Sequence, residues 1–253
     1  TFSTAAREVH ASANGHLLVK WAGPIVGASE GLFNHPADVA VGPNGTVYVA
    51  DTQNHRVQRF DANGNFLGQW GRQGSNPGEF RGPTGIAVDG EGRVYVADTE
   101  NHRVQVFGAT GEPVRQWGSR GSARGQFNTP KGVAVDGEGR VYVADTNNHR
   151  IQVFDRAGVQ LASWGGFGGG QQEGLFQFPE DVAITPEGRA VVVDSGNHRL
   201  QVFGRDGVFV GVVGRSGADP GQFVLPKSVA VDASGRLVVS DSGNRRIQVL
   251  GAL

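Results

Sequence analysis

The segment from Asp145 to Phe154 reads DTNNHRIQVF and places His149 four residues after an aspartate and directly before Arg150. Imidazole and carboxylate groups at this spacing could bind a divalent metal or exchange a proton in acid–base catalysis. Such chemistry ordinarily needs its groups once, converging on one point. The number of times that the chain repeats this segment therefore decides between a chemical role and a structural one.

The segment occurs five times. Its asparagine recurs at intervals of 47, 47, 49 and 47 residues, at Asn54, Asn101, Asn148, Asn197 and Asn244. A phenylalanine, a proline and an aspartate recur in the same register, which divides the chain into units at about 33–71, 80–118, 127–165, 176–214 and 223–250 plus 14–22. Self-similarity at this period is typical of repeat architectures, in which every unit is one supersecondary structure.

We therefore interpret the motif as structural, because the chain copies its histidine into four units and replaces it by Arg245 in the fifth. The Asp and the Arg five residues later can form a charge-assisted pair across a turn, and Asn suits a tight or left-handed turn position. The structural motif residues are Asp51, Asn54, His55, Arg56, Asp98, Asn101, His102, Arg103, Asp145, Asn148, His149, Arg150, Asp194, Asn197, His198, Arg199, Asp241, Asn244 and Arg246.

Each unit is expected to form four short antiparallel strands. In the third unit, residues 132–136, 140–145, 149–154 and 159–165 are apolar or alternating runs separated by turns rich in Gly, Asp and Asn. The run 140–145 is apolar on both faces, so each small sheet must be covered on both sides. A ring of sheets packed face to face meets this requirement, which predicts an all-β fold: a single β-propeller domain over residues 1–253.

The two chain ends indicate how the ring closes. The last unit supplies three strands, whereas residues 14–23, NGHLLVKWAG, align with the fourth strand of the first unit. We expect this N-terminal strand to complete the C-terminal blade, which gives five blades and removes an open sheet edge. Residues 3–7 align with an eroded copy of the motif, so six blades are the alternative interpretation.

The composition limits the classes of function. A formal net charge of −1 gives no overall attraction to nucleic acid or to anionic lipid. The chain has no Cys for disulfides or thiolate metal sites. It has no apolar run near the roughly 20 residues that cross a membrane, so no membrane insertion is expected. It also lacks a Gly-rich phosphate loop followed by a helix and a zinc-protease helix.

Units of the form FxxPxxVAVDxxGxVYVADTxNHRxQVF resemble NHL repeats, from about His16 to Leu250. The resemblance implies a β-propeller, generally of six blades, and leaves function open. The family includes RNA-binding domains of TRIM-type proteins, extracellular sensor domains of bacterial receptor kinases, an amidating lyase with an axial metal site, and protein-interaction modules. The compartment stays open, with an extracytoplasmic sensor-type domain as the favoured interpretation.

The loops that lead from each fourth strand to the next first strand are where the units differ. In a propeller these loops lie on one face around the channel mouth, with the DTxNHR turns. Two neighbouring loops carry a basic group: Arg72, Arg81, Arg120, Arg124 and Lys131. Asp38, Glu180 and Asp181 belong to acidic loops, and Lys227 belongs to a mixed one. The face should therefore have a basic sector beside an acidic sector, and these nine residues are the candidate ligand-binding residues.

This charge distribution favours a non-catalytic, monomeric binding or scaffold module that recognises a protein or peptide. RNA binding is disfavoured, because few aromatic residues accompany the arginines and half of the face is acidic. A metal-dependent lyase or hydrolase would need Asp38, Glu180 and Asp181, with His35 as a distant fourth ligand, and the two lysines near them would oppose a cation. We expect no catalytic residue, no metal and no cofactor.

Overall fold

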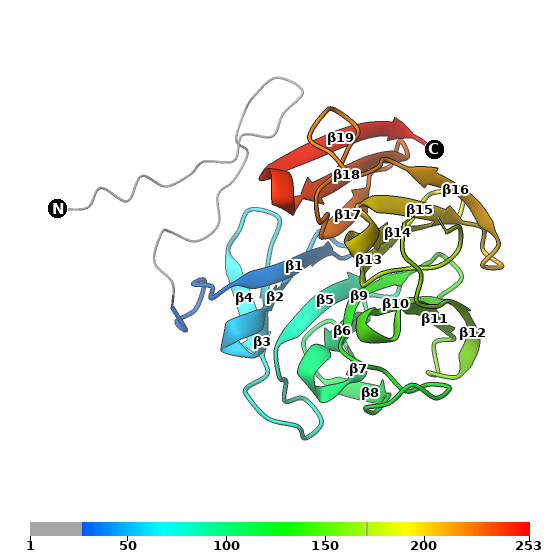
Figure 1. Ribbon diagram of the computed structural model, residues 1–253. Coiled ribbons are helices and arrows are strands. Elements are labelled where there is room, and N and C mark those ends of the chain that lie inside the picture. Colours follow the sequence, from blue (N-terminus) through cyan, green and yellow to red (C-terminus); the bar gives the residue numbers. More distant parts are fainter. Residues whose placement is uncertain (1–26, 171) are drawn as a thin grey trace.

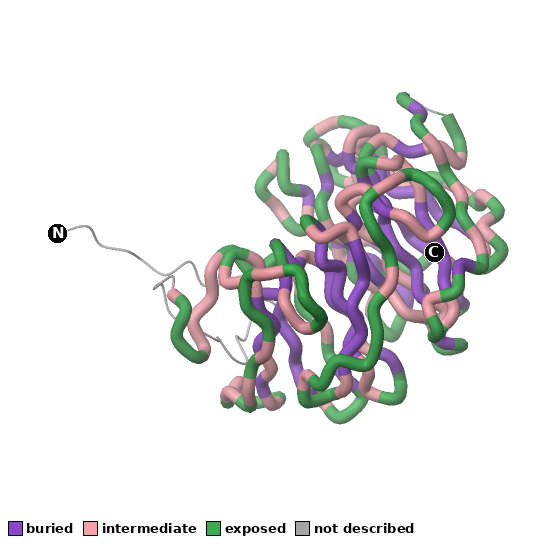
Figure 2. The backbone as a smooth tube through the Cα atoms, turned by 90° about the horizontal axis from the view of Figure 1, so that it is seen from below, coloured by how far each residue is buried: buried purple, intermediate pink, exposed green. Residues whose placement is uncertain are grey.

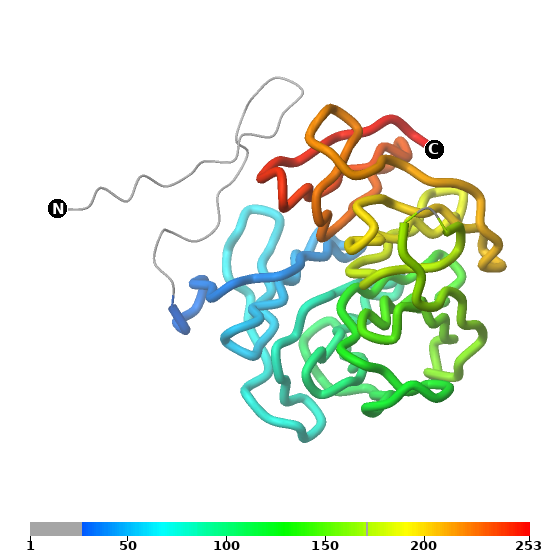
Figure 3. Tube along the Cα trace, viewed as in Figure 1, coloured from blue at the N-terminus to red at the C-terminus, as the bar shows by residue number. Residues whose placement is uncertain are grey.

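The structure is a computed structural model, and it describes residues 27–170 and 172–253. Five antiparallel sheets follow one another around a common axis, in chain order from blue to red (Figures 1 and 3). The predicted all-β propeller with five blades is confirmed. Four of the described blades have four strands in sequential order, and the fifth has three.

The strands are short and have similar bounds in every blade. Blade 1 holds β1 (Pro36–Val41), β2 (Val47–Asp51), β3 (Arg56–Phe60) and β4 (Phe66–Trp70), and blade 2 holds β5 (Pro83–Val88), β6 (Val94–Asp98), β7 (Arg103–Phe107) and β8 (Pro113–Trp117). Blade 3 holds β9 (Pro130–Val135), β10 (Val141–Asp145), β11 (Arg150–Phe154) and β12 (Gln160–Gly165). Blade 4 holds β13 (Pro179–Ile184), β14 (Ala190–Asp194), β15 (Arg199–Phe203) and β16 (Phe209–Val213), and blade 5 holds β17 (Ser228–Val231), β18 (Arg236–Asp241) and β19 (Arg246–Ala252).

A single 3-10 turn joins the second and third strands of each blade. These turns are η1 (Thr52–Asn54), η2 (Thr99–Asn101), η3 (Thr146–Asn148), η4 (Ser195–Asn197) and η5 (Ser242–Asn244). In the part of the chain that the structure describes, no helix is long and apolar enough to span a membrane.

The second strand of each blade lies at the centre of the packing, as its two apolar faces predict. All five residues of β10 are buried. Tyr142 and Ala144 pack with blade 4, while Val141 and Val143 pack with blade 2. Figure 2 shows the same pattern for the whole ring, with buried strands inside and exposed loops outside. Blades 2 to 4 are therefore stabilised mainly by the apolar surface that each buries against its two neighbours.

The tryptophans of the fourth strands also join neighbouring blades. The ring of Trp70 contacts Phe107 of blade 2, with ring centroids 5.6 Å apart. A Cβ at Gly111, which has a φ of +99°, would lie 2.6 Å from the Trp70 ring. Blade 2 therefore needs glycine in this turn, both for the left-handed backbone and for the close approach of the indole.

One pair of apolar faces has no partner among the described residues. Ile247 and Val249 of blade 5 are each 61% exposed, and Val39 and Val41 of blade 1 are 57% and 65% exposed. β1, β5, β9, β13 and β17 pack side by side in that order, but β17 does not pack in this way on β1. The predicted closure by residues 14–22 lies outside the described residues and stays a prediction.

Candidate functional site

The DTxNHR motif forms a buried hydrogen-bond network at the end of each second strand. In blade 2, Arg103 Nε donates to Asp98 Oδ2 at 2.7 Å. The amides of Asn101 and Gln105 donate to the same oxygen at 2.9 and 3.0 Å, and the Arg81 backbone N–H donates to Oδ1 at 2.7 Å. The Asp–Arg contact recurs at 2.7–2.8 Å in the other blades. With four donors on one carboxylate, Asp98 is committed to holding the turn and is a poor metal ligand.

The arginine of the motif also ties the turn to the preceding loop. The Arg103 guanidinium donates to the carbonyl oxygens of Ser75, Asn76 and Glu79 at 2.8–3.0 Å. A guanidinium has five N–H donors in a planar fork, and here those donors reach the carboxylate and three loop carbonyls together. The motif therefore positions the loop that leads into its own blade, and through that loop it positions the face around the channel.

The histidines of the motif occupy the left-handed backbone position, with φ between 53° and 57°. Of the two kinds of position expected to suit asparagine, tight or left-handed, the asparagine has the tight one and the histidine has the left-handed one. The asparagine ends the 3-10 turn, and its side-chain amide is held by the aspartate, as for Asn101 and Asp98. The chain reverses at the residue after the asparagine, so the histidine has the left-handed conformation, which is unfavourable for a residue with a side chain.

Each described histidine of the motif joins its blade to the next one. His102 Nδ1 accepts a hydrogen bond from the Thr129 backbone N–H at 3.0 Å, and His149 Nδ1 accepts one from Phe178 at 3.1 Å. His55 and His198 make the same bond to Gly82 and Leu225. Burial lowers the pKa of His102 and His149, which favours the neutral form that this accepting role requires.

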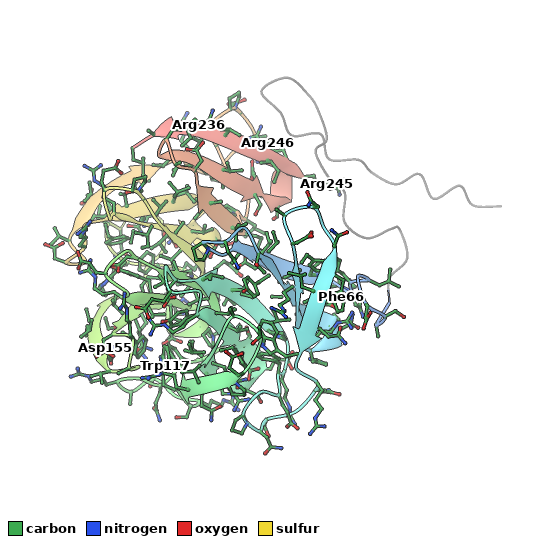
Figure 4. The ribbon with its side chains drawn as sticks, turned by 180° about the vertical axis from the view of Figure 1, so that it is seen from behind. Phe66, Trp117, Asp155, Arg236, Arg245 and Arg246 are labelled. Atoms are coloured by element: carbon green, nitrogen blue, oxygen red, sulfur yellow. The ribbon has the colours of Figure 1, made fainter. Side chains whose placement is uncertain are left out.

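In blade 5 the histidine position holds Arg245, which has no acceptor nitrogen for such a bond. Arg245 and Arg246 lie at the beginning of β19 (Figure 4). Blade 5, which lacks the histidine, is also the one blade on which no following blade packs among the described residues. The histidine therefore forms a hydrogen bond where two blades meet, which gives a structural reason for its repetition.

The innermost strands surround a cavity of about 350 Å³ at the mouth of the channel. Two lysines bind Glu180 at this mouth: Lys131 Nζ donates to Glu180 Oε2 at 2.7 Å, and Lys227 Nζ donates to Oε1 at 2.9 Å. The lining residues are Ala37, Asp38, Thr84, Gly85, Lys131, Gly132, Glu180, Asp181, Lys227, Ser228 and Ser240. Five of the nine predicted ligand-binding residues meet here: Asp38, Lys131, Glu180, Asp181 and Lys227. The other four, all arginines, do not line this cavity.

Two aspartates of this cavity bind the backbone of the following blade. Asp38 Oδ2 accepts the Ile86 N–H at 2.9 Å, and Asp181 Oδ2 accepts the Val229 N–H at 3.0 Å and the Ser228 hydroxyl at 2.8 Å. Burial raises the pKa of Asp38 to about 7, and the charge of Asp181 adds to this rise. Burial likewise raises the pKa of Asp181 to about 6. Near neutral pH the two carboxyls therefore carry less negative charge than their number indicates.

Replacing Asp38 by Ser, the residue at the equivalent position of blade 5, should change how stability depends on pH. A carboxyl whose pKa rises from 3.8 to about 7 on folding disfavours the folded state increasingly from about pH 4 to pH 7, because the unfolded chain ionises first. Over this range the wild type should lose about 3 kcal/mol relative to the Asp38→Ser variant. Urea unfolding at pH 4.5 and pH 7.5 measures this, with Asp206→Ser in an exposed turn as the control. A difference between wild type and Asp38→Ser that stays constant with pH would contradict the assignment.

The predicted basic sector is divided in the structure. Arg72 pairs with Glu79 at 2.9 Å on the outer rim. The Arg124 guanidinium donates to the Gln160 carbonyl on the outer strand of blade 3. Arg120 is exposed beside His102, and its charge helps to lower the pKa of that histidine. Arg81 is exposed as well. Of the five basic residues, only Lys131 reaches the channel.

Two aromatic residues that were not among the predicted site residues, Phe167 and Phe178, lie against the ring of His149, with centroid distances of 5.0 and 4.8 Å. Ser228 and Ser240, which line the cavity, were not among the predicted site residues either. A comparison of equivalent positions would have found the aromatic pair, because the position of Phe167 holds Gln73, Arg120 and Ser216 in other units.

The three acidic residues considered as metal ligands do not form a ligand cluster. Glu180 is held by two lysines, and both aspartates accept backbone N–H groups. Among the described residues, no three His, Asp or Glu side chains are grouped so that they could hold one ion. The channel mouth is therefore a polar surface of paired charges and hydroxyls.

The NHL repeat family model matches residues 33–60, 80–107, 127–154, 176–203 and 223–250, together more than half of the chain. This protein belongs to the NHL-repeat family. Each matched segment of the NHL propeller begins at the phenylalanine before a first strand and ends in the third strand. The segments therefore contain every DTxNHR motif and the residues that line the channel mouth.

Curated relatives match this NHL chain over about one repeat. Protein brain tumor from Drosophila melanogaster is 48% identical over 48 residues, which are 19% of this chain and 5% of that protein. The B-box type zinc finger protein ncl-1 from Caenorhabditis elegans is 52% identical over 40 residues, which are 16% of this chain and 5% of that protein. The matches span a small fraction of either relative.

Solved structures share the fold at low sequence identity. A protein of unknown function from Bacteroides thetaiotaomicron has a TM-score of 0.69 and 18% identity, covering 85% of this chain and 59% of its own. Streptogramin B lyase has a TM-score of 0.61 and 11% identity, covering 85% and 64%. A chain of the nidogen/laminin complex has a TM-score of 0.60 and 17% identity, covering 84% and 78%. At these identities the likeness shows the propeller fold alone.

Proposed function

We propose that this NHL propeller is a non-catalytic, monomeric binding module that recognises a protein or peptide ligand at the channel mouth. The observation that carries this proposal is the cluster of Lys131, Glu180 and Lys227 at the rim of the cavity. Two ammonium groups share one carboxylate, so the cluster keeps one net positive charge. Both lysines are partly exposed, and their remaining N–H donors are available to an acidic ligand.

The environment of the other polar groups supports binding over catalysis. A general base must be within hydrogen-bond reach of the proton that it removes. Asp98 and its equivalents are buried behind arginines, and the Nδ1 atoms of the described motif histidines accept backbone N–H groups. Asp38 and Asp181 hold the backbone of neighbouring blades. These groups hold the turns within blades or join one blade to the next, which leaves the lysines and hydroxyls of the mouth for a ligand.

Charge reversal of Lys131 and Lys227 together should weaken the binding of acidic peptides at least tenfold. A fluorescent pool of heptapeptides rich in Asp and Glu serves as the probe, and anisotropy gives its affinity at several salt concentrations. Rim charges act largely through steering, so the loss should appear mainly in the association rate and shrink at high salt. The matched control is Arg156→Glu, which alters the exposed Arg156–Glu91 pair away from the mouth. Lys131→Gln with Lys227→Gln repeats the test without placing new acids beside Glu180.

A single-stranded oligonucleotide distinguishes RNA binding from peptide binding. Counterion release would give its log affinity a steep linear fall with log salt, of about 0.7 per phosphate contacted. Tight binding with such a slope, or an acidic-peptide affinity that both lysine variants leave unchanged, would overturn the proposed function.

A further inference from the structure

An exposed aromatic cluster lies beside the channel mouth, where blades 3 and 4 meet. Phe167 is 66% exposed and Phe178 is 43% exposed, although both are large apolar side chains. They flank the ring of His149, which is fixed in place because its Nδ1 accepts the Phe178 N–H. The cluster therefore presents apolar ring surface to solvent on a positioned support. Exposed apolar surface of this kind is a common feature of interaction sites.

The fold does not require aromatic residues at these positions. Phe178 has a φ of 53°, a left-handed conformation that disfavours a large side chain, and Gly82 has the equivalent position in blade 2 with a φ of 55°. The other units place polar residues or Leu225 there. The loop after Phe167 is also two residues longer than its equivalents, since Phe167 pairs with Phe176 where Arg120 pairs with Phe127. The added length of this loop therefore lies between Phe167, the strand partner of Phe176, and the residues just before Phe178.

The apolar cluster is continuous along the chain with the charged cluster. Phe178 and Glu180 flank Pro179 at the beginning of β13, and Leu225, which is 45% exposed, stands two residues before Lys227. Two residues of chain span at most about 7 Å, so the Cα atoms of Phe178 and Glu180 lie within that distance. The apolar cluster therefore stands next in the chain to the carboxylate that both lysines bind.

We propose that this surface binds a carboxylate adjacent to an apolar side chain, in a protein or peptide ligand. The apolar side chain lies against Phe167 and Phe178, and the carboxylate accepts hydrogen bonds from Lys131 and Lys227. Glu180 keeps both ammonium groups at the rim, and because the two lysines carry one more charge than Glu180, a second carboxylate brings the three groups and the ligand to neutrality. This inference rests on the proposed function and names its ligand chemistry. The carboxylate comes either from a chain terminus or from an acidic side chain.

Four fluorescently labelled peptides test the proposal with the full chain. The first is Gly-Gly-Gly-Phe with a free terminal carboxylate, the second is Gly-Gly-Asp-Phe with a terminal amide, and the other two have Ala in place of Phe. Each Phe peptide that carries a recognised carboxylate should bind about tenfold more tightly than its Ala counterpart. The terminal-acid and Asp peptides show which source of carboxylate the site takes.

Variants copied from other units separate the two parts of the site. Phe167→Gln with Phe178→Thr introduces the residue types found at the equivalent positions, Gln73 and Thr129. The fold should therefore tolerate this double variant, and the variant should lose the preference for Phe over Ala. Lys131→Gln with Lys227→Gln should weaken the Phe and Ala peptides equally. Val114→Thr, at an exposed apolar position on β8, should change neither affinity.

Equal binding of Phe and Ala peptides by the wild type would overturn this inference, and so would a preference that survives the double Phe variant. If the lysine dependence persisted in either case, the proposed function would stand. Loss of the lysine dependence as well would overturn both.

Discussion

Replacing Asp98 by asparagine should destabilise the propeller by about 3–5 kcal/mol, because it leaves the buried Arg103 guanidinium without its counter-charge. Asp98 is fully buried and accepts hydrogen bonds from Arg103, Asn101, Gln105 and the Arg81 backbone. Both carboxylate oxygens of Asp98 accept hydrogen bonds, and in asparagine one of them would be replaced by an NH₂ group that faces N–H donors. Urea unfolding followed by circular dichroism measures the change in the free energy of unfolding.

The same substitution in blade 5 provides an internal comparison. The Arg103 side chain is 8% exposed, whereas Arg246, the equivalent partner of Asp241, is 30% exposed. Water can stabilise an uncompensated charge at Arg246, so Asp241→Asn should cost clearly less than Asp98→Asn. Asp206→Asn, in an exposed turn, should leave the midpoint nearly unchanged. A loss below 1 kcal/mol for Asp98→Asn, or equal losses in blades 2 and 5, would contradict the role assigned to the network.

Deleting residues 1–22 should cause aggregation or a large loss of stability. Among the described residues, β19 pairs only with β18, and Ile247 and Val249 stand exposed on the same blade. An unpaired, apolar edge strand is a template for association with another chain. Residues 14–23 align with a fourth strand, so we predict that they cover this edge. Light scattering and the melting temperature of the truncated chain measure the effect.

Hydrogen exchange in the full chain gives a second measurement of the same closure. If residues 14–22 pair with β19, the β19 amides that do not bond to β18 should exchange slowly in the full chain and rapidly after the deletion. Deleting residues 1–6 alone should leave both readouts unchanged. A truncated chain that stays monomeric and melts at the parent temperature would refute the closure.

Repetition made the fold predictable from the sequence. The run VYVAD of the first three units, which is AVVVD and LVVSD in the last two, is apolar on both faces and requires a covering sheet on each side. Five units at a period near 47 residues supply those sheets in a ring. The predicted strand 149–154 begins one residue later, at Arg150, because His149 has the left-handed backbone of the turn. That difference is local, since the turn geometry depends on hydrogen bonds that the residue pattern does not specify.

The channel site was only partly predictable. Five of the predicted ligand-binding residues lie one or two positions after the prolines of the innermost strands, whose ends meet at one mouth, and all five line the cavity: Asp38, Lys131, Glu180, Asp181 and Lys227. The charge pattern of the loops also indicated a basic sector, but Arg72 and Arg124 turn to partners on the outer rim. Long arginine side chains can bind any of several nearby acceptors, and the loop sequence alone does not specify which acceptor lies within hydrogen-bond distance.

The sequence by itself determined the repeat, the strand pattern and the pairing of each motif aspartate with its arginine, since these depend on residues close together in the chain. Tertiary structure decided every contact between blades. It placed Glu180 between lysines 49 and 47 residues away, and it brought His149 against the Phe178 N–H of the next blade. The physical reason is that the tilt and spacing of packed sheets set which side chains of successive units meet, and those quantities arise only when the whole ring packs.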